Sequence, residues 1–72
     1  MVVQGTVKFW RDDDGWGVIA SPAVPDDVWV HFSAIEAVGY RALAQGDPVE
    51  FDCQPAEQDG YRLVATRVRK LQ

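Results

Sequence analysis

The aromatic side chains of this sequence are the residues whose types and spacing could do chemistry. The stretch DVWVHFSAI places Trp29 and His31 two residues apart, and DGWGVI gives Trp16 and Val18 the same spacing. Alternate residues of a β-strand share one face, so each pair projects from one side of its strand. Exposed rings on a sheet can stack on flat ligands such as nucleobases, because every base has a π-face.

The residues of opposite parity in the same stretches are aliphatic. Val28, Val30 and Ile19 predict the hydrophobic core. We therefore expect the aromatic set on the outer face, where an exposed aromatic cluster usually marks a binding surface. We expect Gly15 and Gly17, next to the rings, to let a flat ligand approach the backbone closely.

The polar residues predict no catalytic or metal site. No serine or cysteine has a histidine at a spacing typical of nucleophilic catalysis, and no phosphate-binding glycine loop is present. One histidine, His31, and one cysteine, Cys53, do not make a metal site. The run Asp12-Asp13-Asp14 lacks the spacing of a calcium loop and predicts a solvated turn. We expect a non-enzyme without a cofactor, in which His31 stacks on or hydrogen-bonds a base, or else has a structural role near a strand end.

The length and composition predict one globular domain over residues 1–72. Hydrophobic residues make up 47% of the chain and charged residues 25%, which is ordinary for a folded protein. A single cysteine allows no internal disulfide, and no segment approaches the roughly 20 apolar residues of a membrane span. We expect a cytoplasmic monomer with neither a membrane nor a small-molecule substrate as partner.

Short alternating runs separated by turn residues predict an all-β fold. The expected strands cover residues 2–11, 16–20, 27–32, 48–54 and 61–71, with a loop over 55–60. Between them, Ser33 could cap a helical turn over 33–37, with Glu36 three residues on. Because closure removes the unpaired edges of a small sheet, we expect a five-stranded antiparallel barrel.

Five segments of this chain resemble those of bacterial cold-shock proteins, which are oligonucleotide-binding (OB-fold) barrels. GTVKFW (5–10) is similar to the family's G-x-V-K-W-F, DGWGVI (14–19) to K-G-F-G-F-I, DVWVHFSAI (27–35) to D-V-F-V-H-F-S-A-I, GYRAL (39–43) to G-F-x-x-L, and QGDPVEF (45–51) to E-G-x-x-V-x-F. Each segment alone is weak, but five in order at matching spacing are specific.

The resemblance implies binding of single-stranded RNA and DNA, and a role as an RNA chaperone or as a regulator of transcription or translation. The predicted contact residues are Lys8, Phe9, Trp10, Arg11, Trp16, Val18, Trp29, His31, Phe32 and Tyr40. In this set Lys8 takes the place of the family's phosphate-contacting lysine. An alternative reading puts Phe9, Trp10 and Phe32 in the barrel core, because Trp10 and Phe32 fall off the simplest alternation.

The sequence departs from the family pattern at several binding positions. Asp14 replaces a basic residue, Val18 a phenylalanine and Arg11 an asparagine, and the Trp-Phe order is reversed as Phe9-Trp10. The formal net charge is −4, which disfavours binding through phosphates. We expect weaker or more selective binding than in a typical member, with a shallow salt dependence. The alternative from another class is a small barrel whose acidic, aromatic surface binds a protein.

The outward parity of Trp29 also leads us to expect that Trp29→Ala abolishes nucleic-acid binding and leaves the fold intact, because an exposed ring contributes little to a core.

A substitution of Asp14, the carboxylate before the first glycine of DGWGVI, tests whether this departure from the family pattern weakens binding. We expect Asp14→Lys to tighten binding of a single-stranded oligonucleotide, because a carboxylate that repels phosphates becomes a cation that attracts them. Titration of both proteins with the same oligonucleotide at one salt concentration measures the difference. Unchanged or weaker affinity would remove Asp14 as the cause of a deficit.

Overall fold

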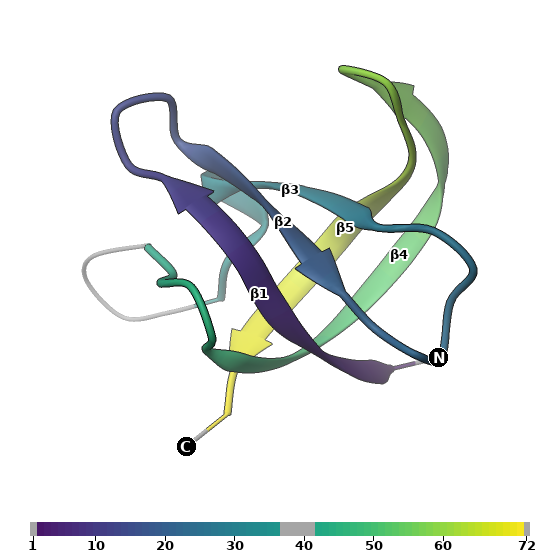
Figure 1. The fold of residues 1–72 in the computed structure, drawn as a ribbon, viewed down its shortest axis with the longest axis horizontal. Helices are drawn as coiled ribbons and strands as arrows, with labels where there is room; N and C mark the ends of the chain where they lie inside the picture. The colour runs from purple at the N-terminus through teal and green to yellow at the C-terminus, as the bar shows by residue number, and fades with distance from the viewer. Residues whose placement is uncertain (1, 37–41, 72) are drawn as a thin grey trace.

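Five strands and one short 3-10 turn make up the computed structural model, which describes residues 2–36 and 42–71. The elements are β1 (Val3–Arg11), β2 (Trp16–Ala20), β3 (Val28–His31), η1 (Phe32–Ala34), β4 (Pro48–Gln58) and β5 (Tyr61–Lys70). The strands close into a barrel in the order β1-β2-β3-β5-β4 (Figure 1). The predicted all-β, five-stranded barrel is confirmed. Its neighbouring strands are antiparallel except β3 and β5, which pair in parallel.

The strand boundaries agree with the sequence pattern to within one residue except in β4. This strand continues to Gln58, so the predicted loop over 55–60 is wrong. Gln58 pairs directly with Tyr61, and the two residues between them, Asp59 and Gly60, have φ values of 51° and 86°. Two successive positive φ angles fit the twist of a tight hairpin, so the ladder extends to its tip. A register shift after Pro55 accommodates the proline, which cannot donate to the ladder.

The helical turn also differs from the sequence expectation. It is a 3-10 turn over Phe32–Ala34 with His31 as its cap, and Ser33 is not the cap. The backbone N–H of Ser33 donates to Nδ1 of His31 at 3.3 Å. Because a histidine ring nitrogen can accept this bond, the strand residue itself caps the turn. Glu36 bonds to Arg67 and takes no part in the cap.

The barrel interior is filled mainly by β-branched aliphatic residues. Val28, Val30 and Ile19 are completely buried, which confirms the predicted core. The remaining buried members of the core cluster are Val7, Ile35, Leu43, Val49, Phe51, Ala65 and Val68. β-Branched side chains pack well on a pleated surface, and such small residues suit the narrow lumen of a five-stranded barrel.

A β-bulge in β1 changes the parity of the strand. Val7 pairs with Ile19, whereas Phe9 pairs with Val18, so Lys8 is the extra residue. The bulge therefore interrupts the alternation of faces along β1, so that residues two apart across it point to opposite faces. As a result Val7 lies in the core, while Phe9 lies next to Trp16 outside it.

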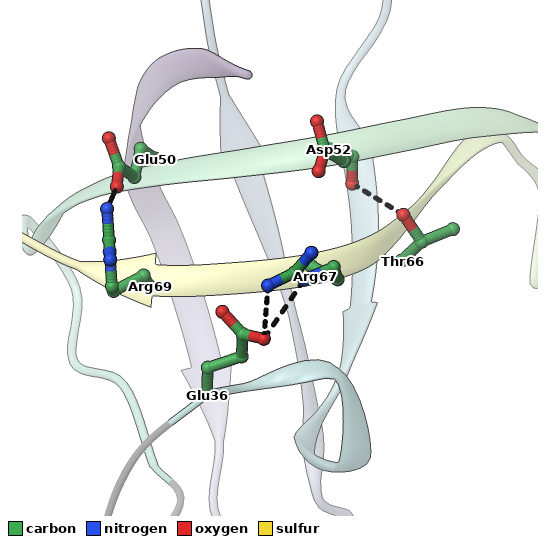
Figure 2. Close-up of polar contacts among 6 residues, drawn as sticks. All are labelled: Glu36, Glu50, Asp52, Thr66, Arg67 and Arg69. Carbon is green, nitrogen blue, oxygen red and sulfur yellow. Dashed lines mark hydrogen bonds and ion pairs between the residues drawn. The ribbon is translucent and has the colours of Figure 1, made fainter. Parts of the chain in front are cut away.

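The basic residues near the C-terminus form ion pairs on the outside of β4 and β5. Figure 2 shows Arg67 bonded to Glu36 and Arg69 paired with Glu50. Nη2 of Arg67 lies 2.7 Å from Oε2 of Glu36. Lys70 lies 3.3 Å from a carboxylate oxygen of Asp47. Exposed pairs of this kind contribute at most about 1 kcal/mol each, but they neutralise the cationic tail locally.

Cys53 is half-buried and packs against the core cluster, as a small core residue does. Burial, followed by the charge of neighbouring Asp52, raises the pKa of its thiol. Because the thiolate is the reactive form, this thiol is held in its unreactive state at neutral pH. In the part of the chain that the structure covers, no helix has the length and apolarity to cross a bilayer.

The packing around Gly17 in β2 leads to a stability prediction. A Cβ atom at Gly17 would lie 2.5 Å from the backbone oxygen of Phe9 and 2.5 Å from Cε3 of Trp10. We expect Gly17→Ala to lower the free energy of unfolding by about 2 kcal/mol or more, because backbone has to move. Urea unfolding followed by circular dichroism measures it.

Gly60→Ala is the matched control, since nothing lies within 4 Å of the added methyl group and only the φ of +86° opposes it. Its expected loss is about 1 kcal/mol. Equal losses at the two glycines would contradict the packing account.

Candidate nucleic-acid interface

An unbroken row of five rings runs across the outer face of β1, β2 and β3 and onto η1. In order the rings are Phe9, Trp16, Trp29, His31 and Phe32, and we call them the aromatic row. Successive ring centroids are 5.7, 6.0, 5.9 and 4.5 Å apart. The structure thus brings together five of the residues that the sequence predicts for the site.

The register of β2 against β3 builds the centre of the row. Trp16 pairs with His31, and Val18 pairs with Trp29. Directly opposed residues in an antiparallel pair project from the same face, so Trp16 and His31 are cross-strand neighbours. The rings of Trp16 and Trp29 are nearly parallel at 23°, and those of Trp29 and His31 at 19°.

Two central members of the predicted site are buried, contrary to the expectation that they are exposed. Val18 has no exposed surface and Trp29 is only 9% exposed. Both lie outside the core cluster, so their parity is as predicted, but neighbouring side chains cover them. Trp29 therefore supports the row from within. The premise that its ring is exposed, on which the expectation of an intact Trp29→Ala fold rests, is wrong. Its indole N–H has no hydrogen-bond partner in the structure as described, so packing alone orients the ring.

Trp10 lies apart from the row. Its indole packs against the core cluster and closes over Gly17. The indole N–H donates to Oδ1 of Asp12 at 2.8 Å. Of the two readings of Trp10, this geometry supports the barrel core. Gly17 therefore makes room for Trp10 and not for a ligand, which corrects the expectation for that glycine.

Phe32 is the opposite case, because this residue is 43% exposed. The reading of Phe32 as core is wrong. The ring lies against Gly15, where an added Cβ would come within 3.0 Å of its Cδ1 atom. The backbone N–H of Phe32 also donates to the carbonyl of Gly15 at 2.8 Å. Gly15 therefore positions the most exposed ring of the row.

Hydrogen bonds to His31 set the tautomer of its ring. Nδ1 accepts from the N–H of Ser33 and lies 2.8 Å from the Ser33 hydroxyl oxygen. A nitrogen that accepts a hydrogen bond carries no proton, so the neutral ring carries its proton on Nε2. That arrangement leaves a flat ring with a donor at its far edge. Among the described residues, no group of three or more potential ligands could hold a metal ion.

Lys8, the predicted phosphate contact, is engaged by a carboxylate. Its Nζ lies 2.8 Å from Oδ2 of Asp27, and this hydrogen bond, together with the charge of Asp27, raises the pKa of Lys8. Lys8 is therefore charged but paired, although both side chains are exposed enough for a phosphate to compete.

The cations of the chain are mostly neutralised in the same way. Six of the seven Lys and Arg residues lie in the described ranges, and four of these six, Lys8, Arg67, Arg69 and Lys70, are in ion pairs. Arg11 instead lies over the row, with its guanidinium carbon 5.5 Å from the Phe9 ring centroid and 5.8 Å from that of Trp16. Tyr40, the last predicted contact, lies outside the described residues.

Sequence reasoning missed two features of this site. The first is Ser33, which orients His31; the H-x-S spacing was a usable signal, since short polar side chains often bond two residues away. The second is Asp27, which holds Lys8 from 19 residues away in the sequence. No local pattern reveals such a pair.

The five-stranded barrel is the architecture of the oligonucleotide-binding fold. Within that class the chain belongs to the cold-shock domain family: the model of the "'Cold-shock' DNA-binding domain" matches residues 3–71. Proteins of this family generally bind nucleic acids.

Curated relatives match over most of their length. The major cold shock protein of Micrococcus luteus is 44% identical over 68 residues, which is 93% of this chain and 96% of that protein. The cold shock-like protein CspC of Escherichia coli K12 is 39% identical over 66 residues, or 92% and 96% of the two chains. The major cold shock protein CspA of Bacillus cereus is 43% identical over 62 residues, or 86% and 85%.

The burial of Trp29 predicts a loss of stability on truncation. We expect Trp29→Ala to lower the free energy of unfolding by about 3 kcal/mol, because a buried indole leaves a large cavity. Phe32→Ala, at the exposed end of the same row, should lower it by less than about 1 kcal/mol. Urea unfolding of the three proteins gives both values, and a Trp29→Ala protein as stable as the wild type would contradict this account.

Proposed function

We propose that this protein binds single-stranded RNA and DNA by stacking bases on the aromatic row, and that it acts as an RNA chaperone or as a regulator of transcription or translation. The observation that carries the proposal is the continuity of the row. Five rings follow one another at 4.5–6.0 Å on one outer face. A single barrel holds the whole row, so one copy of the chain suffices for binding.

Stacking alone can supply a useful affinity. Each base stacked on an aromatic side chain contributes roughly 1–3 kcal/mol. Three or four bases at about 2 kcal/mol each approach the roughly −8 kcal/mol of a micromolar complex. An affinity of this size competes with weak hairpins without ATP or any catalytic step, which suits a chaperone of transcripts.

The charge distribution supports a small phosphate contribution. The net charge is −4, and four of the described cations already have carboxylate partners. Phosphates that approach Lys8 have to displace Asp27. Binding should therefore depend weakly on salt, since each neutralised phosphate adds to the salt dependence.

A second candidate is the binding of a protein on the same face. Its specific support is the acidic turn beside the row, where Asp12, Asp13 and Asp14 are all exposed. An anionic rim around an aromatic surface suits a basic protein segment better than a polyanion.

A fluorescence titration separates the two candidates. Oligo-thymidine and oligo-adenosine of equal length are added to the protein at low and at physiological salt, and tryptophan emission is followed. We expect saturable quenching at both salts, with a log–log slope of about −1.4 to −2.1 from two or three phosphate contacts. A slope of about −4 or steeper would contradict the stacking account. No quenching at either salt would favour the protein partner.

Two substitutions control for the location of binding. Phe32 and Val2 are exposed large hydrophobic residues, at 43% and 57%, and only Phe32 belongs to the row. Phe32→Ala should weaken oligonucleotide binding roughly fivefold or more through one lost stacking contact. Val2→Ala should leave the affinity unchanged, and equal effects of the two would place binding elsewhere.

A further inference from the structure

Arg11 lies on the binding face although three carboxylates follow it in the sequence. Its guanidinium carbon is 5.5 Å from the ring centroid of Phe9 and 5.8 Å from that of Trp16. Asp12 accepts the indole N–H of Trp10. Within the described part of the chain, Arg11 forms no ion pair with Asp12, Asp13 or Asp14. The cation is thus held over the rings and not in the acidic turn.

The backbone of the β1–β2 turn fixes where this side chain begins. The carbonyl of Arg11 accepts the N–H groups of Asp14 at 3.2 Å and Gly15 at 2.8 Å. Arg11 is the last residue of β1 and pairs with Trp16 of β2. Since these contacts involve only main-chain atoms, the side chain can be changed without loss of the turn.

The contact with the rings leaves the hydrogen-bonding capacity of Arg11 unused. A guanidinium above an aromatic ring is attracted through its charge, and this attraction consumes none of its five N–H donors. The donors lie in one plane as a rigid fork that suits two adjacent acceptors. When bases stack on the rings beside Arg11, the edges of these bases lie next to the guanidinium fork.

We propose that Arg11 gives the aromatic row a preference for guanine, with the guanidinium donating to O6 and N7 of a guanine bound beside Phe9 and Trp16. The inference rests on the proposed stacking function. Guanine is the base that presents two neighbouring acceptors on this edge, and arginine is its commonest bidentate partner. In a single strand that edge is free of pairing and open to the protein.

Three labelled oligonucleotides of equal length test the proposal by fluorescence anisotropy. The first is all thymidine, the second carries one central guanine, and the third carries 7-deazaguanine, which lacks the N7 acceptor, at the same place. We expect the wild type to bind the guanine strand roughly fivefold or more tighter than the 7-deazaguanine strand. In Arg11→Met this ratio should fall to about one, because the methionine side chain has no N–H donor for O6 and N7.

Arg62→Met is the matched control, since Arg62 is exposed, lies outside the aromatic row and makes no ion pair in the described residues. The ratio of its affinities for the guanine and 7-deazaguanine strands should equal that of the wild type. A wild-type ratio of one, with the thymidine strand still bound, overturns the guanine preference and leaves the stacking function standing. A ratio that persists in Arg11→Met assigns the preference to another group. If none of the strands binds, both proposals fail.

Discussion

The bulge at Lys8 in β1 determines which aromatic side chains reach the binding face. One extra residue lets Val7 point into the barrel and still brings Phe9 beside Trp16 on the outside. The same shift turns Trp10 toward the core, where it covers Gly17. Because the barrel interior is filled by aliphatic residues and one ring, Phe51, the other large rings lie on the outer surface or at its margins. The aromatic row is thus a consequence of how the interior is filled.

The aromatic row has a buried centre, which supports it, and an exposed end, which a ligand can reach. Trp29 in its middle is nine-tenths buried and stacked between Trp16 and His31, whereas Phe32 at one end is open to solvent. A platform built in this way is held rigid at its centre. In the proposed function, bases then meet rings already in place, and little ordering is needed on binding. The hydrogen bonds of Ser33 to His31 serve the same end, because they set the plane and the tautomer of that ring.

The pairing of its described cations distinguishes this chain from a protein that binds nucleic acid mainly through phosphates. Its described cations are mostly committed to carboxylates on the outside of β4 and β5 or, for Lys8, to Asp27. Arg11 is retained over the rings. Under the proposed function, a chain whose described cations are mostly paired gains affinity mainly from base faces and edges, and these carry the chemical identity of the base. Selectivity is then a natural outcome of a weak phosphate contribution.

The sequence by itself determined the strand alternation, the core residues Val28, Val30 and Ile19, and the outward parity of Trp16 and His31, because period-two patterning is a local property of the backbone. The sequence also identified the family, because its matching segments follow one another in the family's order along the chain. Only the tertiary structure decided the depth of Trp29, the inward turn of Trp10 and the pairing of Lys8 with Asp27. Burial depth, a bulge and a long-range ion pair depend on neighbours brought together by barrel closure. No single strand contains that information.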